Sequence, residues 1–340
     1  MLRSFNKKIL VALAIVSGGN VCATAQETVS YTPEFHGTLR PRMEFSTVDN
    51  AHRFQLRNAR LSVNGFVAPF IDYYIQGDVC DRGDMKILDG WVRLAVTNNF
   101  KFQSGQFRMP FGVDPFRGPH TYIFANRSFI GKNIFNYRAV GAKIAYRLPQ
   151  IPLTLEAGAF NPSKIGDHTP WNETFAFASK AVYRLDNVSF ATGFASIRPG
   201  ASRMNAIDGA VTWKSGRWLA EGEYMNTWYA NRGYKHTHSY NAYVDYHLPV
   251  EAGVFNQLSF QGRFDGMTDF SNGLPGDNGK LTANTPACNR VTIGTTISYN
   301  QSENRFLDIR ANYEASFYHS DVIVTPDMGD KLVVEMVLRF

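Results

Sequence analysis

The residues best suited to chemistry lie in small groups, each lacking a partner that catalysis would need. Glu221 and Glu223 could act as general acid and base, but on one strand face they are better explained as neutralising nearby Lys and Arg. The run 235–238 (KHTH) places two histidines on one side of an extended segment, where a third metal ligand is missing. Motifs for nucleophilic catalysis, phosphate-binding loops or dinucleotide binding do not occur. The sequence therefore predicts no enzyme, no cofactor and no metal site.

The start of the chain has the three parts of a secretory signal peptide. Basic residues precede an apolar core at 9–16 (ILVALAIV), and residues 23–25 (ATA) form a cleavage site. The apolar run is too short to span a bilayer as a helix. We therefore expect a signal peptide at 1–25 and one mature unit at 26–340, with a retained N-terminal anchor as the alternative.

Charge and cysteine content narrow the class of the mature chain. It keeps 32 Lys and Arg against 29 Asp and Glu, because the leader holds three basic residues and no acidic one. A balance this even gives no reason to expect nucleic acid as a partner. Cys80 and Cys288 are the cysteines that remain after cleavage, and we place both in long loops. A bridge between them and two free thiols are both open, with free thiols favoured.

Apolar and polar residues alternate with period two along most of the chain, which is the pattern of β-strands with two unlike faces. In 34–45, for example, Leu39 and Met43 share one face while Arg40 and Glu44 share the other. The alternating segments are 34–45, 54–66, 69–79, 86–96, 99–108, 139–148, 152–161, 173–185, 188–196, 206–215, 217–226, 238–248, 256–265, 290–299, 305–317 and 331–340. The register slips near Arg57, where we expect a β-bulge. Sixteen strands are predicted, with fourteen as the alternative because 54–66 and 99–108 are weaker.

Loop lengths and aromatic residues give two further regularities. Connections after even strands are mostly short and those after odd strands usually longer, which is the asymmetry of an outer-membrane barrel. Aromatic residues recur at the short-turn ends of strands, on the predicted lipid face: Tyr146, Tyr183, Trp213, Trp218, Tyr246, Tyr299 and Phe340. Such a girdle suits a membrane interface. The prediction is an all-β, transmembrane antiparallel β-barrel, multi-pass in a bacterial outer membrane, with its polar rows facing a wet lumen.

Several segments resemble motifs of one family. Residues 54–65 (FQLRNARLSVNG), 88–92 (LDGWV), 105–112 (GQFRMPFG) and 262–265 (GRFD) are similar to motifs of the phosphate-selective porin O and P family. The resemblance implies a sixteen-stranded trimeric porin whose third loop, here 109–138, folds into the lumen. The arginine ladder said to line the pore of phosphate-specific members does not align here, so phosphate is one candidate solute among several.

The candidate pore residues are the basic side chains of that loop and of the inward strand faces. Loop 109–138 carries four positive charges against Asp114, and fixed positive charge in a constriction raises the local anion concentration. The predicted anion-contacting residues are Arg117, Arg127, Lys132 and Arg138 in the loop and Arg40, Arg60, Lys143, Arg263 and Arg310 on the wall. The alternative for the loop residues is solvated charge in contact with lipopolysaccharide.

These features together predict a porin for passive diffusion of small hydrophilic solutes, leaning to anions. The alternative is an outer-membrane barrel enzyme or adhesin without a solute pore, and a soluble secreted carbohydrate-binding sheet is third. Expected partners are small anionic or polar solutes, outer-membrane lipid and lipopolysaccharide, two further copies in a homotrimer, and the barrel-assembly machinery, which would read the terminal Phe340.

Overall fold

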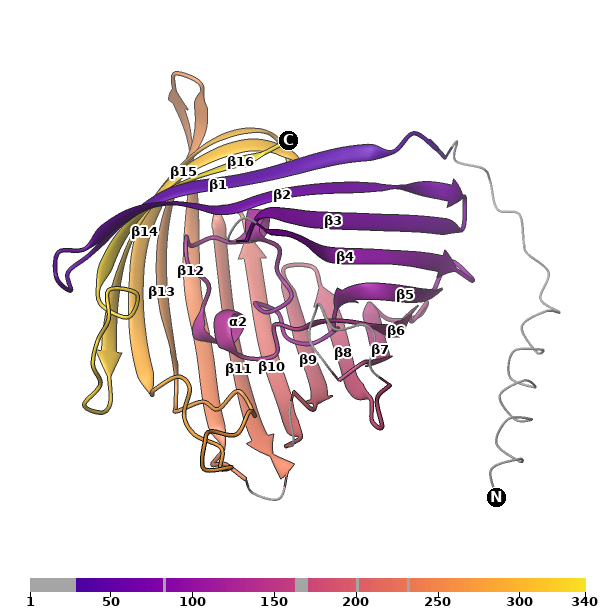
Figure 1. Cartoon of the computed structure of the whole chain (residues 1–340). Coiled ribbons are helices and arrows are strands. Elements are labelled where there is room, and N and C mark those ends of the chain that lie inside the picture. The colour runs from indigo at the N-terminus through magenta and orange to yellow at the C-terminus, as the bar shows by residue number, and fades with distance from the viewer. Residues whose placement is uncertain (1–28, 82–83, 163–170, 200–201, 231–232) are drawn as a thin grey trace.

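The strands close into a single barrel (Figure 1). The computed structural model describes residues 29–340 apart from 82–83, 163–170, 200–201 and 231–232, so the predicted signal peptide lies outside the described residues. Sixteen strands are present in the described part of the chain, each antiparallel to its neighbours, and β1 pairs with β16 to close the ring. A closed sheet leaves no unpaired edge, as a lipid environment demands.

The elements follow one another in simple up-and-down order. They are β1 (Glu34–Ser46), β2 (His52–Ala68), β3 (Ile71–Asp81), β4 (Asp84–Ala95), β5 (Phe100–Arg108), the short helices η2 (Pro119–Thr121) and α2 (Phe129–Asn133), β6 (Arg138–Arg147), β7 (Leu153–Phe160), β8 (Ala176–Leu185), β9 (Val188–Ile197), β10 (Met204–Ser215), β11 (Trp218–Tyr229), β12 (Thr237–Ala252), β13 (Phe255–Met267), β14 (Cys288–Ser302), β15 (Arg305–Tyr318) and β16 (Lys331–Arg339).

The predicted strand count is confirmed, and the fourteen-strand alternative is wrong. The irregularity expected near Arg57 is also present. Arg40 pairs with Asn58 while the next residue, Pro41, pairs with Leu56, so Arg57 is left over between them. An extra residue on one strand of an antiparallel pair is a β-bulge, and it restores the inward and outward alternation on both sides of Arg57.

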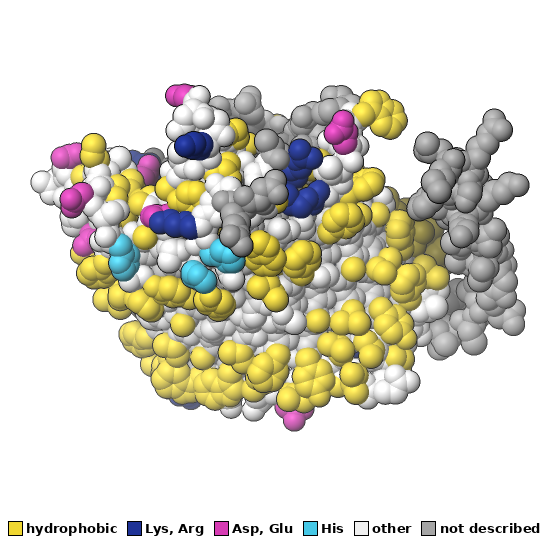
Figure 2. All heavy atoms as spheres, turned by 90° about the horizontal axis from the view of Figure 1, so that it is seen from below, with side chains coloured by type: hydrophobic (Ala, Val, Ile, Leu, Met, Phe, Trp, Pro, Cys, Tyr) yellow, Lys and Arg dark blue, Asp and Glu magenta, His cyan; other side chains and the backbone are white. Residues whose placement is uncertain are grey.

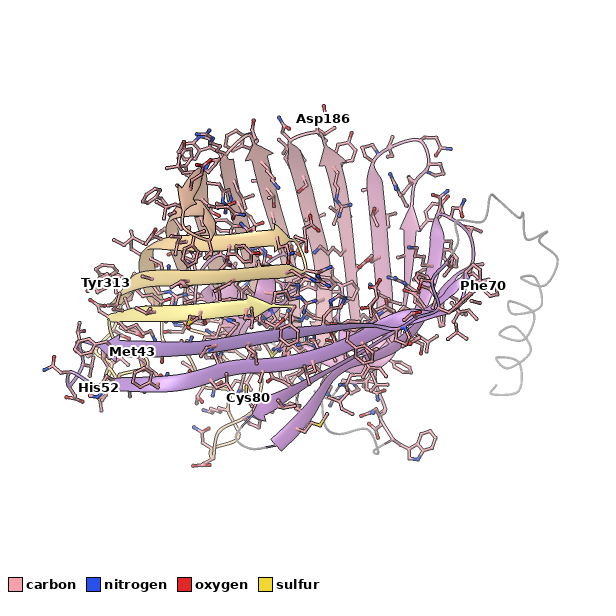
Figure 3. The ribbon with its side chains drawn as sticks, turned by 90° about the horizontal axis from the view of Figure 1, so that it is seen from above. Met43, His52, Phe70, Cys80, Asp186 and Tyr313 are labelled. Carbon is pink, nitrogen blue, oxygen red and sulfur yellow. The ribbon has the colours of Figure 1, made fainter. Side chains whose placement is uncertain are left out.

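The two rims of the barrel differ in loop length. Strands β8 and β9 are joined by two residues that include Asp186, and β2 and β3 by two that include Phe70, whereas 109–137 separate β5 from β6. Figure 3 shows Asp186 and Phe70 at the short-turn rim and His52 at the opposite end of its strand. The predicted sorting of short and long connections holds from β5 onward, whereas the connections from β1 to β2 and from β3 to β4 on the long-loop rim are short.

The outer wall is apolar where a membrane would touch it. Apolar side chains gather in bands on the wall, and charged side chains lie beyond them toward the edges (Figure 2). The predicted aromatic girdle faces outward: Trp213, Trp218, Tyr299 and Phe340 are exposed, and Trp218 packs on Tyr246 with ring centroids 4.6 Å apart. Within the described residues, no helix is long and apolar enough to cross a membrane.

The inner wall corrects one expectation, that of a uniformly polar lumen. Toward the long-loop rim, inward residues of β8 to β11 join a dry hydrophobic core with side chains from 109–137. Its members include Phe111, Ile130, Ile134 and Phe135 from the loop, and Ala178, Ala195, Ile197, Met204, Ala206 and Met225 from the wall. The expectation was wrong here because loop residues, not water, fill this part of the lumen.

The last residue closes the barrel seam. The Phe340 amide donates to the Gly37 carbonyl oxygen at 3.1 Å, and the Gly37 amide donates to the Phe340 carbonyl oxygen at 2.7 Å. The Phe340 ring lies so close to Gly37 that a Cβ there would meet its Cζ at 2.2 Å. A larger residue at position 37 would therefore have to displace this ring from its present position.

The cysteines lie in strands and not in loops, which corrects their predicted placement. Cys80 is in β3 and Cys288 is the first residue of β14, because both strands extend further toward the long-loop rim than the alternation suggested. Both are unbridged, as the favoured alternative expected.

Candidate functional site: the lumen and the loop inside it

The segment 109–137, called loop 3 below, lies within the ring of strands, where α2 is visible in Figure 1. The Ser128 side chain caps α2 by accepting from the Gly131 amide at 3.0 Å, and its hydroxyl donates to Asp114 Oδ2 at 2.5 Å. A Cβ at Gly131 would meet that same carboxylate oxygen at 2.1 Å. The local sequence therefore folds the loop around the Asp114 carboxylate.

Wall arginines hold the loop by its main chain. Arg40 of β1 donates to the Ala125 carbonyl oxygen at 2.7 Å, Arg263 of β13 to that of Asn126 at 2.8 Å, and Arg290 of β14 to that of Arg127 at 2.6 Å. Arg310 of β15 donates to the Tyr122 carbonyl oxygen at 2.8 Å. Three of these arginines therefore bind three consecutive carbonyl groups, which fixes the path of the loop.

Carboxylates on the same or neighbouring strands neutralise these arginines. Their ion pairs are Arg40–Glu335 at 2.7 Å, Arg310–Asp308 at 3.0 Å, Arg290–Asp265 at 2.9 Å, Arg290–Glu314 at 3.3 Å and Arg263–Asp265 at 3.2 Å. We call these eight residues the grip network. Its four guanidinium groups meet four carboxylates, so it carries no net charge. Buried arginines need such partners because an unpaired buried charge is very costly.

The opposite side of the lumen holds the start of loop 3. Glu223 of β11 accepts from the amides of Val113 and Asp114 at 2.7 and 2.9 Å. Lys180 of β8 donates to the Gly112 carbonyl oxygen at 2.5 Å. Gly112 has φ +71°, a conformation that favours glycine. Glu221 and Glu223, weighed above as an acid and base pair, therefore serve the loop: Glu221 forms an ion pair with Arg117.

Most of the predicted anion-contacting residues already have an acidic partner. Besides the three in the grip network, Arg117 pairs with Glu221 and also with Asp114 at 3.2 Å. The remaining paired members are Arg60 with Asp78 at 2.9 Å, Arg138 with Asp89 at 3.0 Å, and Lys143 with Glu156 at 3.3 Å. Arg138 was assigned to the loop, but it begins β6, since pairing with Arg108 extends the sheet by one residue.

Arg127 and Lys132 differ from the others because neither side chain has a carboxylate partner among the described residues. Arg127 donates to the carbonyl oxygens of Gly131 and Arg117 at 2.9 and 3.1 Å, and its guanidinium lies over the Tyr122 ring at 4.7 Å. Lys132 is exposed at the end of α2.

Arg108 of β5, which the sequence reasoning did not single out, resembles Arg127. Its guanidinium donates to the carbonyl oxygens of Pro115 and Arg117. Burial lowers the pKa of Arg127, and the positive charges of Arg108, Arg60 and Arg138 lower it further. We call Arg60, Arg108, Arg127 and Arg138 the four-arginine face. Asp78 and Asp89 pair with two of its members, so positive charge is left over.

Nearby His120 adds no charge to this region at neutral pH. It lies in η2, at the edge of the lumen cavity described next. Burial lowers the pKa of His120 to about 4, with Arg339 and Arg60 adding to the effect. A histidine with that pKa is neutral at pH 7.

Open space lies above and below the loop. Near the long-loop rim, a cavity of about 280 Å³ is lined by Glu44, His52, Arg53, Asp327 and Lys331. Toward the short-turn rim, a cavity of about 540 Å³ borders His120, Gln261, Thr296 and Asp308. Neither cavity is lined by a member of the four-arginine face. Arg108 and Arg138 lie at the long-loop ends of β5 and β6, and Arg127 belongs to loop 3 itself.

The histidine pair of 235–238 lies outside the lumen. His236 and His238 are exposed, and Tyr224 contacts His238 Nδ1 through its hydroxyl at 2.7 Å. Trp228 stacks on His236 with centroids 6.5 Å apart. In the described part of the chain, no group of three His, Cys, Asp or Glu could hold a metal ion. The pair therefore belongs to the outer surface and not to a pore or a metal centre.

No family model and no curated protein sequence matches the chain. Solved structures similar to it include the trimer form of OmpT, an outer membrane protein of Vibrio cholerae (12% identity, TM-score 0.62, 91% of this chain and 99% of that one), the anion-selective porin from Comamonas acidovorans (14%, 0.61, 91% and 98%) and OmpF of Salmonella typhi in complex with daunomycin (11%, 0.61, 91% and 97%). Identities this low establish the fold alone. The chain has the sixteen-stranded barrel of outer-membrane porins, which with its apolar outer wall fits a multi-pass protein of that membrane.

Proposed function

We propose that this protein is a channel for passive diffusion of small hydrophilic solutes and that it favours anions. The observation that carries the preference is the four-arginine face, where Arg108 and Arg127 bind only main-chain oxygens, so that no carboxylate among the described residues offsets their charge. A cation beside a passage attracts anions by about 1 kcal/mol at 4 Å in water, and by more where solvent is partly excluded. Two unpaired charges are therefore enough to bias permeation severalfold.

The route runs beside loop 3, where the arginines are, and not through the dry core on its other side. The core closes the lumen against β8 to β11 with packed apolar side chains. The cavity that Arg53 and Lys331 line supplies the outer entrance, and the large cavity near His120 supplies the inner one. The proposed route passes the four-arginine face between these two cavities, neither of which its members line.

Electrical recording of the purified protein tests the proposal. Planar bilayers should show stepwise conductance, and the reversal potential in a potassium chloride gradient should have the sign of chloride preference. The preference should shrink at high salt because screening shortens the reach of each charge. Ohmic steps with cation preference would contradict the anion preference. An absence of steps would favour the alternative, a barrel enzyme or adhesin without a solute pore.

The resemblance of 54–112 to phosphate-selective porins makes phosphate a specific candidate. Phosphate added to one side should then reduce the chloride current at concentrations where sulfate has little effect. Equal effects of the two oxyanions would leave a general anion channel and remove the case for phosphate.

We further propose that the protein works as a homotrimer with its outer surface in lipid and lipopolysaccharide. The trimer form recorded for OmpT of Vibrio cholerae, which has a similar barrel, supports this assembly. Chemical crosslinking of whole outer membranes should give a band at three times the chain mass. A band at the chain mass alone would contradict it.

Assembly is proposed to depend on recognition of Phe340 by the barrel-assembly machinery. Phe340 also closes the seam against Gly37, so its deletion removes a structural contact as well as the signal. Phe340→Leu separates the two roles. It keeps the backbone hydrogen bonds of the seam and an apolar last residue, so a loss of assembly in this variant would come from the missing aromatic ring. Normal membrane levels of the chain lacking Phe340 would contradict the proposal.

A further inference from the structure

A second group of cations surrounds a cavity at the short-turn end of the lumen. The cavity has a volume of about 270 Å³ and lies on the inner face of β4 to β7. Its charged lining residues are Arg93, Lys101, Lys143, Arg147 and Glu156. This volume holds several waters, which is enough for a small ion with part of its hydration shell.

Two of the four cations are neutralised within the wall. Lys143 pairs with Glu156 at 3.3 Å, and Arg93 binds Asp72 of β3 through two contacts. Lys101 and Arg147 have neither an ion pair nor a side-chain hydrogen bond among the described residues, and both are exposed. The cavity wall therefore carries two positive charges that the protein does not compensate.

The remaining residues that line the cavity are mostly polar. Asn98, Asn99, Gln103 and Thr154 add neutral amides and a hydroxyl, while Tyr146 is the aromatic member. The Arg147 amide donates to the Asn99 carbonyl oxygen at 2.9 Å, which ties the strand carrying one cation to the turn beside it. Ammonium, guanidinium and amide groups together donate hydrogen bonds to oxyanions, and charge-assisted bonds are the strongest of these.

We propose that this cavity is a binding site for small oxyanions, carboxylate or phosphate, with Lys101 and Arg147 as the residues that hold them. The inference rests on the proposed anion channel and adds a second station to it. Arg108 and Arg138 of the four-arginine face lie at the long-loop ends of β5 and β6, while Lys101 and Arg147 lie at the short-turn ends of the same strands. Lys101 is seven residues from Arg108, and Arg147 is nine residues from Arg138, so the two levels are about 24–30 Å apart along the strands. Both cationic groups therefore belong to the same stretch of wall.

Binding to the detergent-folded barrel can be measured without any channel activity. The probe is inorganic phosphate, observed through its phosphorus-31 line width at increasing protein concentration. The test variant is Lys101→Gln with Arg147→Gln. Lys214→Gln is the matched control, because Lys214 is an exposed lysine near the short-turn end of β10 that has no ion pair among the described residues and does not line the cavity.

The wild type should broaden the phosphate signal, and Lys214→Gln should do the same. The double variant should bind phosphate at least about tenfold more weakly than the wild type, since it loses two charge-assisted contacts. Acetate observed by carbon-13 should follow the same order if the site takes oxyanions as a class. Equal broadening by all three proteins, or an equal loss in Lys214→Gln, would overturn the site.

Failure here is distinguishable from failure of the proposed function. A barrel that conducts with anion preference while all variants bind phosphate equally removes only the second site. A barrel that binds phosphate through Lys101 and Arg147 but gives no conductance steps keeps the site and removes the channel.

Discussion

Two walls of the lumen use arginine in opposite ways. In the grip network, on β1 and β13 to β16, every guanidinium meets a carboxylate and several donate to the main chain of loop 3. On β4 to β6 and the facing side of loop 3, Arg108, Arg127, Lys101 and Arg147 lack acidic partners among the described residues. Position in a pore is therefore not enough to give a residue a part in selectivity. What matters is the charge that remains after pairing.

The grip network should fail when its charges are unbalanced. Glu335 is fully buried between Arg40 at 2.7 Å and Arg310 at 3.7 Å. Glu335→Gln should destabilise the barrel by about 3–5 kcal/mol, because it leaves buried positive charge uncompensated. Thermal unfolding and heat-modifiability on gels measure the loss. Glu303→Gln, at an exposed turn, is the control that should behave as wild type. Equal stability of the two variants would show that the network is not structural.

The second test loosens the dry core beneath the loop. Ile130 is fully buried in it. Ile130→Ala should weaken the packing of loop 3 against the barrel wall by about 2–5 kcal/mol. Current noise should rise and proteases should cut loop 3 faster, while the barrel itself persists. The matched control is Ile323→Ala, whose side chain is 90% exposed. A silent Ile130→Ala would mean that the arginine contacts alone hold the loop.

Labelling of the two cysteines tests whether the hydrophobic core beside loop 3 excludes water. Cys288 belongs to the buried core, whereas Cys80 is partly exposed. A maleimide should label Cys80 in the folded barrel and reach Cys288 only after unfolding. Mass spectrometry of the unreduced protein should show two free thiols. Rapid labelling of Cys288 in the native state would contradict a dry core.

The smallest expected effect is that of pH. The pKa of His120 is lowered to about 4 in the folded state, compared with about 6.5 in the unfolded chain. Protonation of His120 therefore favours the unfolded state, and the folded state loses stability as the pH falls from about 6.5 to about 4. Ion selectivity should therefore be the same in wild type and His120→Asn between pH 7.5 and 5.5, and their stabilities should converge in acid. A selectivity difference at pH 6 would show that His120 is charged in the pore.

The sequence predicted the barrel well because each strand is specified locally. Period-two alternation needs no knowledge of partners, and even the bulge at Arg57 is visible as a slip of that pattern. Loop 3 is different, since its contacts join residues far apart in the chain, such as Arg40 with Ala125. No feature of the neighbouring sequence distinguishes Arg108, which binds main-chain oxygens, from Arg138, which pairs with Asp89.

One signal in the sequence could have revealed the dry core. Inward positions of β8 to β10 hold Ala176, Ala178, Ala195 and Ala206, all buried. Small apolar residues facing the lumen on three successive strands leave room that another segment must fill. The bulky residues of loop 3, among them Phe111 and Phe135, fill it. Alternation along a strand indicates which face each residue is on, but it does not indicate how much space the residue leaves.

Reversal potentials of two variants decide whether pairing sets which arginines act on solutes. Arg127→Gln removes a cation that has no carboxylate partner among the described residues, whereas the double variant Arg117→Gln with Glu221→Gln removes an ion pair between loop 3 and β11 and leaves the net charge unchanged. In a potassium chloride gradient at low salt, Arg127→Gln should move the reversal potential toward cation preference. The double variant should leave the reversal potential close to that of the wild type, although it loosens the loop. Equal shifts toward cation preference in both variants would contradict the claim that unpaired charge sets the selectivity.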